Sequence, residues 1–224
     1  MTQAITIDVE SGEHVSGLLL APGSAVACYM LAHGAGAGMT HPFMAAVAEG
    51  LAERSVATLR YQFPYMERGS RRPDSPKLAQ ATVRAAVAEA GRRLEGMPLV
   101  AGGKSFGGRM TSQAQAASPL PGVRGLAFIG FPLHPAGKPS DERAAHLAAI
   151  DVPMLFLQGT RDELASLDLL QPVVDRLHVP AALQLFADAD HAFHVPARTG
   201  RKDSQVMAEL LDVLANWIGA TASG

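Results

Sequence analysis

The chain has 224 residues, of which 48% are hydrophobic and 18% charged, so it can fill a sizeable core and is not disordered by composition. Its formal net charge of −2 at pH 7 gives no reason to expect nucleic acid or an anionic membrane as a partner. The length suits a single domain over residues 1–224, and no repeat or linker divides it.

The first residues and the single cysteine provide evidence on the cellular compartment of the protein. The first residues lack the basic region and apolar core of a signal peptide, and no apolar stretch reaches the ~18 to 20 residues that span a bilayer. Cys28 lies in an apolar run and cannot form an intramolecular disulfide. We therefore expect a cytoplasmic protein with no membrane span, in which Cys28 is a buried thiol in a core strand.

Apolar runs predict the strands in chain order. Residues 5–9 and 15–20 are separated by Ser11-Gly12, which suits a hairpin. Six further runs are short and almost wholly apolar, which is typical of strands covered on both faces. They are residues 26–31, 56–59, 99–101, 123–129, 154–157 and 183–186.

Helical patterns fill the gaps between these runs. Ser75-Pro76 is a cap followed by proline at the first helical position, and residues 43–54 and 168–177 show weaker helical patterns. The last segment has one apolar stripe, made of Met207, Leu210, Leu211, Leu214 and Ile218. Alternating strands and helices predict an α/β fold, with a mostly parallel twisted sheet and helices on both faces.

A strand that ends in glycines precedes the candidate nucleophile. Residues 99–101 run into Gly102-Gly103-Lys104-Ser105-Phe106-Gly107-Gly108, and a helix of small residues follows. A nucleophile elbow needs this arrangement, because only residues without side chains allow the tight approach of strand and helix. Ser105 is the predicted nucleophile, and we expect Lys104 and Arg109 beside it to be structural ion-pair partners.

A second glycine-rich loop, His33-Gly34-Ala35-Gly36-Ala37-Gly38, follows the third strand. It can present backbone N–H groups without obstruction, so we predict an oxyanion hole formed by Phe106 N–H with Ala35 N–H, or Gly36 N–H as second choice. The spacing does not fit a phosphate-binding GxGxxG loop or P-loop. His33 is expected to be a structural hydrogen-bonding residue.

Two later strands end close to an acid and a base. Asp162 follows residues 154–157, and we prefer it to Glu163 and to Asp151, which precedes its strand. His191 follows the last strand and is the predicted base, with His194 as runner-up. The order Ser105, Asp162, His191 is that of a serine hydrolase with a strand-to-helix elbow.

These motifs also carry a family resemblance. The glycine-rich loop, Gly-Gly-Lys-Ser-Phe-Gly-Gly-Arg, Gly-Thr-Arg-Asp and Ala-Asp-His-Ala-Phe resemble small lidless α/β-hydrolases related to dienelactone hydrolase. They are most similar to the branch whose domain also occurs in a subunit of a histone-acetyltransferase complex, as is the segment 61–67. The resemblance extends from about Ala25 to Ile218 and implies the α/β-hydrolase fold, the triad and hydrolase chemistry. Serine replaces the cysteine nucleophile of dienelactone hydrolase, so that enzyme's substrate is not implied.

The predicted activity is cleavage of a carboxylic ester or related acyl bond, as in carboxylesterases and thioesterases, on a small-molecule substrate with no cofactor and no metal. The short stretch 131–150 leaves no room for a sizeable cap, so we expect an open site. The candidate pocket walls are Phe63, Tyr65, Phe131 and Leu133.

Several alternatives stay open. The fold could serve a non-catalytic binding or scaffold module, or an acyltransferase that uses an acceptor other than water. A homodimer is an open expectation. Arg60 and the basic loop 68–72 could attract an acidic substrate, although a solvated loop is the simpler interpretation.

Overall fold

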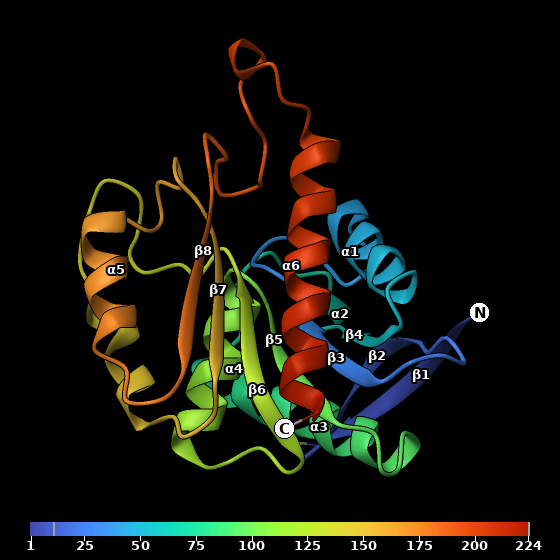
Figure 1. The fold of residues 1–224 in the computed structure, drawn as a ribbon. Coiled ribbons are helices and arrows are strands. Elements are labelled where there is room, and N and C mark those ends of the chain that lie inside the picture. The colour runs from blue at the N-terminus through green and yellow to red at the C-terminus, as the bar shows by residue number, and fades with distance from the viewer. Residues whose placement is uncertain (11, 224) are drawn as a thin grey trace.

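A computed structural model describes residues 1–10 and 12–223, and within them eight strands form one sheet (Figure 1). The strand order is β1-β2-β4-β3-β5-β6-β7-β8. β1 and β2 pair antiparallel and β2 joins β4 antiparallel, whereas every later pairing is parallel. The strands are β1 Thr2–Val9, β2 Glu13–Leu20, β3 Ala27–Ala32, β4 Val56–Tyr61, β5 Leu99–Lys104, β6 Val123–Ile129, β7 Met154–Gly159 and β8 Ala181–Phe186.

The predicted hairpin is present, with Val9 opposite Glu13 and Gly12 N–H donating to Val9 O at 2.9 Å. Ser11, the other predicted turn residue, lies outside the described residues. β3, β4 and β7 are buried at every position, as expected for strands covered on both faces. β8 corrects that expectation, because it is the edge strand and is only partly buried, with Leu185 37% exposed.

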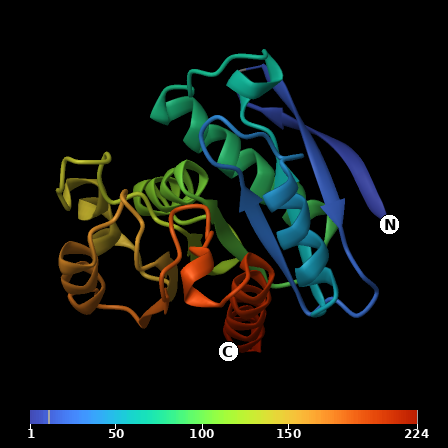
Figure 2. The same ribbon diagram turned by 90° about the horizontal axis from the view of Figure 1, so that it is seen from above.

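Helices cover both faces of the sheet, as predicted (Figure 2). α3 Pro76–Arg93, α4 Phe106–Ala117 and α5 Leu167–Asp175 pack into one apolar core, and α1 Pro42–Ala52 and α6 Asp203–Ser223 pack into the other. Ser75 caps α3 by accepting the Leu78 N–H at 3.4 Å, and Pro76 stands at the first position. The short helix α2 Pro64–Glu67 was not predicted.

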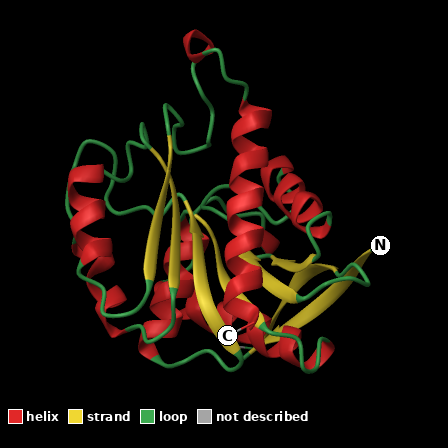
Figure 3. Cartoon of the chain, in the orientation of Figure 1, coloured by secondary structure: helices red, strands yellow, loops and turns green. Residues whose placement is uncertain are grey.

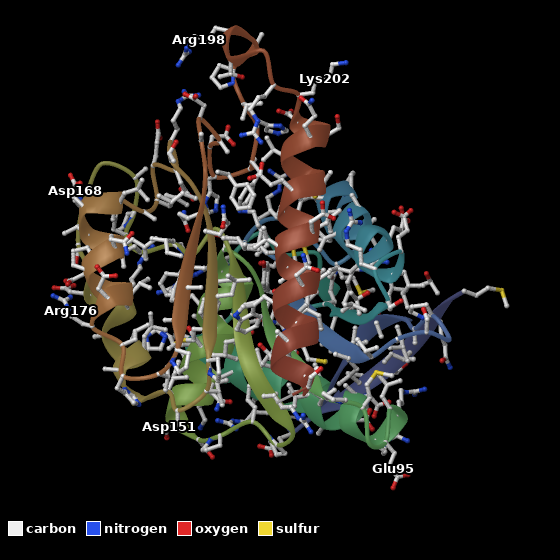
Figure 4. The ribbon with its side chains drawn as sticks, viewed as in Figure 1. Glu95, Asp151, Asp168, Arg176, Arg198 and Lys202 are labelled. Atoms are coloured by element: carbon white, nitrogen blue, oxygen red, sulfur yellow. The ribbon has the colours of Figure 1, made fainter. Side chains whose placement is uncertain are left out.

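The connections at the carboxyl ends of the strands decide how open that edge is. Among the described residues, 131–150 contain only the 3-10 helix η1 Glu142–Ala149, so no sizeable cap is present. The connection from β8 to α6 is long, contains η2 Ala197–Thr199, and extends beyond the sheet (Figure 3). Arg198 and Lys202 mark its outer part, and Asp151 lies at the opposite end of the molecule (Figure 4).

No helix of the described residues combines the length and the apolar character that crossing a membrane requires.

Candidate active site

Ser105 sits in a strained turn between β5 and α4. Its backbone has φ 50° and ψ −116°, a conformation that L-residues seldom adopt. A Cβ at Gly107 would lie 2.6 Å from the carbonyl oxygens of Ala32 and His33, and one at Gly103 would lie 2.2 Å from Ala32 O. The glycines are therefore required for close packing of β3 against the turn, as a nucleophile elbow demands.

The loop after β3 lies beside this turn. Within the described residues, the N–H groups of Ala35 and Gly36 have no hydrogen-bond acceptor, and Phe106 N–H is the first of α4 and has none inside the helix. Gly36 has φ +75°, which favours glycine there. Three unsatisfied donors thus lie on the two segments that flank Ser105.

His33 holds the base of this loop. Its ring is fully buried, donates through Nδ1–H to Gly34 O at 2.8 Å, and accepts Phe63 N–H at Nε2 at 3.0 Å. Burial lowers the pKa of His33 to about 4, so the ring is neutral at neutral pH. Both ring nitrogens are engaged, which fits the structural role predicted for it.

Asp162 follows β7 and its side chain is fully buried. Oδ1 accepts the Leu164 N–H at 2.8 Å, and Oδ2 lies 2.6 Å from His191 Nδ1. Oδ2 also accepts a hydrogen bond from the Gln158 side-chain amide. The two rejected acids lie elsewhere: Glu163 is exposed, and Asp151 pairs with His178 at the far end of the sheet.

His191 lies between Asp162 and the cavity. A carboxylate can only accept, so Nδ1 carries the proton and Nε2 is left as an acceptor. No hydrogen bond of the described residues joins Ser105 to His191, and such bonds often tighten only when substrate binds. His194 instead pairs with Asp203 at 2.6 Å, and its side chain is 66% exposed.

Ser105 and His191 share the wall of one cavity of about 630 Å³. Most of its lining is apolar and comes from the loop after β3, the start of α1 and the segment 191–194. The lining residues are Gly34, Ala35, Ala37, His41, Pro42, Phe43, Met44, Ala46, Lys104, Ser105, Leu164, His191, Ala192 and His194.

The four predicted wall residues are not part of this lining, which corrects the expectation. Phe63, Tyr65, Phe131 and Leu133 are at most 1% exposed. Phe63 and Tyr65 pack against the rings of His33 and Phe106, so they support the loop from behind. Phe131 packs on Phe128 and Phe156 in the core.

The expected ion pairs of the elbow are likewise absent from the described residues. Lys104 Nζ donates to His191 O at 2.5 Å, and Arg109 Nε is buried without a partner. In the basic region, Arg68 pairs with Glu13 at 2.7 Å and Asp74 at 2.6 Å, and Arg60 is 5% exposed. Neither lines the cavity.

Three features of the site were not predicted. Gln158 links Asp162 to the Phe131 N–H, which it accepts at 2.9 Å. Lys104 contacts the His191 loop, and residues of α1 supply the apolar wall. A polar residue near the end of a buried strand, four positions before the acid, was the available signal for Gln158.

Cys28 is fully buried in β3, as predicted. Burial raises the pKa of its thiol to about 12, so it is held in the unreactive protonated form.

The strand order and the elbow define the α/β-hydrolase fold. Residues 25–219 match the model of the alpha/beta hydrolase domain family, and the chain belongs to that family.

Three solved structures illustrate the similarity of fold. Dienelactone hydrolase from Anabaena variabilis has a TM-score of 0.80 and 20% identity, over 97% of this chain and 96% of that one. A serine hydrolase without a lid from Xanthomonas campestris has a TM-score of 0.73 and 21% identity, over 97% and 95%. Est1E from Butyrivibrio proteoclasticus with ferulic acid bound has a TM-score of 0.73 and 16% identity, over 95% and 100%. At these identities the likeness concerns the fold.

Proposed function

We propose that the protein is a serine hydrolase that cleaves a carboxylic ester or related acyl bond through Ser105, His191 and Asp162. The observation that carries the proposal is the 2.6 Å contact between His191 Nδ1 and Asp162, on a histidine that shares a cavity with Ser105 in its strained turn. Residues 1–224 are proposed to act as one domain, which the continuous sheet supports.

In the proposed mechanism, His191 Nε2 removes the proton from Ser105 Oγ as the oxygen attacks the acyl carbon. Asp162 keeps the imidazole in the required tautomer and stabilises the imidazolium. The N–H groups of Phe106 and Ala35, with Gly36 as second choice, receive the oxyanion, each worth roughly 3–4 kcal/mol. His191 then protonates the leaving group, and a water activated by the same ring hydrolyses the acyl-enzyme.

The cavity supports a substrate class. Its wall is mostly apolar and includes Pro42, Phe43 and Met44 of α1 together with Leu164 and Ala192. We infer a small ester or thioester with an apolar acyl group of short to medium length. A series of p-nitrophenyl esters and matched thioesters of increasing acyl chain length measures this preference. A kcat/KM that keeps rising for acyl groups too large for the cavity would contradict it.

Labelling with a fluorophosphonate tests the nucleophile. Wild type should be labelled and should turn over a short p-nitrophenyl ester, whereas Ser105→Ala should lose both. His178→Gln is the matched control and should keep labelling, because His178 pairs with Asp151 at the far end of the sheet. Wild-type turnover in Ser105→Ala would refute the proposal.

Two other functions follow from different outcomes. Folded wild type that binds acyl ligands but shows no Ser105-dependent labelling would be a binding module, as kinship with the histone-acetyltransferase subunit branch would allow. Labelling with product formed only when an alcohol or thiol acceptor is added would indicate an acyltransferase. A homodimer stays a prediction that light scattering would check.

A further inference from the structure

Lys104, the residue immediately before Ser105, makes an unusual contact for a lysine. Its side chain is partly buried, and no carboxylate of the described residues lies within 4.0 Å of Nζ. The ammonium instead donates to the backbone carbonyl of His191 at 2.5 Å. A partly buried cation with no carboxylate in direct contact depends on the other contacts that it makes.

The ammonium has a second contact with the same loop. Nζ lies 5.5 Å from the centroid of the Phe193 ring and 5.9 Å from that of Phe43 in α1. The two rings are stacked on each other, with centroids 6.3 Å apart, and Phe193 has φ 65°. Lys104 therefore contacts the loop on both sides of Ala192, through a carbonyl and through an aromatic face.

Gly130, after β6, provides the space for this arrangement. A Cβ there would lie 2.8 Å from Lys104 Nζ and 3.3 Å from His191 Cε1. Gly130 also has φ +67°, a conformation suited to glycine. The ammonium and the imidazole thus both lie against one bare backbone position.

We propose that Lys104 is a positioning residue, whose ammonium holds the backbone of His191 at a fixed distance from the nucleophile turn. This inference rests on the proposed function. Because Lys104 and Ser105 are adjacent in the chain, the contact ties the base directly to the strand that carries the nucleophile. Asp162 holds only the His191 ring, so the Lys104 contact adds a hold on the backbone of the same residue, within the connection between β8 and α6.

The charge of Lys104 gives the inference its own signature. Burial lowers the pKa of Lys104 to about 8, while the carboxylates of Asp162 and Asp190 oppose that shift. The imidazoles of His191, His41 and His194 are the other titratable groups on the cavity wall. As pH rises through about 8, the amine becomes neutral and both the charge-assisted bond and the cation–π contact weaken.

The test compares Lys104→Met, Lys104→Arg and the control Lys77→Met, a change at an exposed position in the first turn of α3. In Lys104→Met we expect kcat to fall roughly 10- to 100-fold, as for a displaced base, and by a larger factor than KM changes, since Lys104 also lines the cavity. Wild type should lose activity above about pH 8. This decline on the basic side of the pH–activity profile should be absent in Lys104→Met and shifted to higher pH in Lys104→Arg. The profile of Lys77→Met should match that of wild type.

The outcomes separate the two proposals. Wild-type kcat in Lys104→Met, together with an inactive Ser105→Ala, would overturn the positioning role and leave the hydrolase assignment intact. An active Ser105→Ala would instead overturn the hydrolase assignment. If Lys104→Met does not fold, Lys104→Arg decides, because an unshifted decline on the basic side would overturn the inference.

Discussion

Gln158→Leu is expected to damage the site without touching the cavity. Gln158 is fully buried, donates to Asp162 Oδ2, and accepts the Phe131 N–H at 2.9 Å. Leucine has a similar volume and can make neither bond. A hydrogen bond to a charged group contributes about 1.5–3 kcal/mol, and a buried N–H without an acceptor costs about 1–3 kcal/mol. Since the two effects overlap at one site, we expect a loss of about 3 kcal/mol in the free energy of unfolding.

The same change should lower kcat by about 10- to 100-fold, because Asp162 loses one of the contacts that orient it toward His191. KM should change little, since Gln158 does not line the cavity. Urea unfolding and ester kinetics measure the two effects. Gln80→Leu is the matched control, because within the described residues the Gln80 side chain bonds only Gln113, at 3.3 Å in a partly buried position.

A second variant, Gln158→Glu, keeps an acceptor for the Phe131 N–H but places a carboxylate against Asp162. Like charges raise the pKa of the pair, so this variant should be most stable at acid pH and lose stability as pH rises through the raised pKa. Stability and kcat in Gln158→Leu that equal those of Gln80→Leu would refute the role assigned to Gln158.

Two further predictions concern buried groups. The pKa of His33 is about 4 in the folded protein and 6.5 for a free histidine. As pH falls, the unfolded chain therefore takes up this proton before the folded protein does. Wild type should therefore lose about 2 kcal/mol of stability between pH 6.5 and 4.5 relative to His33→Gln, and parallel pH curves would contradict this. Cys28 should resist a thiol-specific reagent in native protein and react in guanidinium chloride, because burial raises its pKa to about 12, and rapid native labelling would show that β3 is accessible.

The candidate triad residues could be located from sequence because parallel strands place their carboxyl ends on one edge of the sheet. Ser105, Asp162 and His191 each follow a recognisable apolar run, and the structure brings Asp162 and His191 into contact. Their shared role in catalysis stays a prediction.

The cavity wall could not be located in the same way. An aromatic residue after a strand gives the same sequence pattern whether it faces the core or the site. The prediction that Phe63 and Phe131 line the pocket is therefore wrong. The wall instead comes from α1, whose direction depends on the length and glycines of the loop before it. Periodicity carries no such information.

Contacts that support the site escape sequence analysis for a different reason. Lys104 reaches a backbone carbonyl 87 residues later in the chain. Because every residue has such a carbonyl, the sequence does not indicate which one a lysine contacts. The carboxylate of Asp162 lies shortly after the end of β7, a strand that is buried at every position, whereas His191 is carried by the connection between β8 and α6. The base is thus the more easily displaced partner, and loosening its loop should reduce turnover before it affects the fold. For this reason the side chains that hold the 191–194 segment are the places where small changes in sequence should alter activity most.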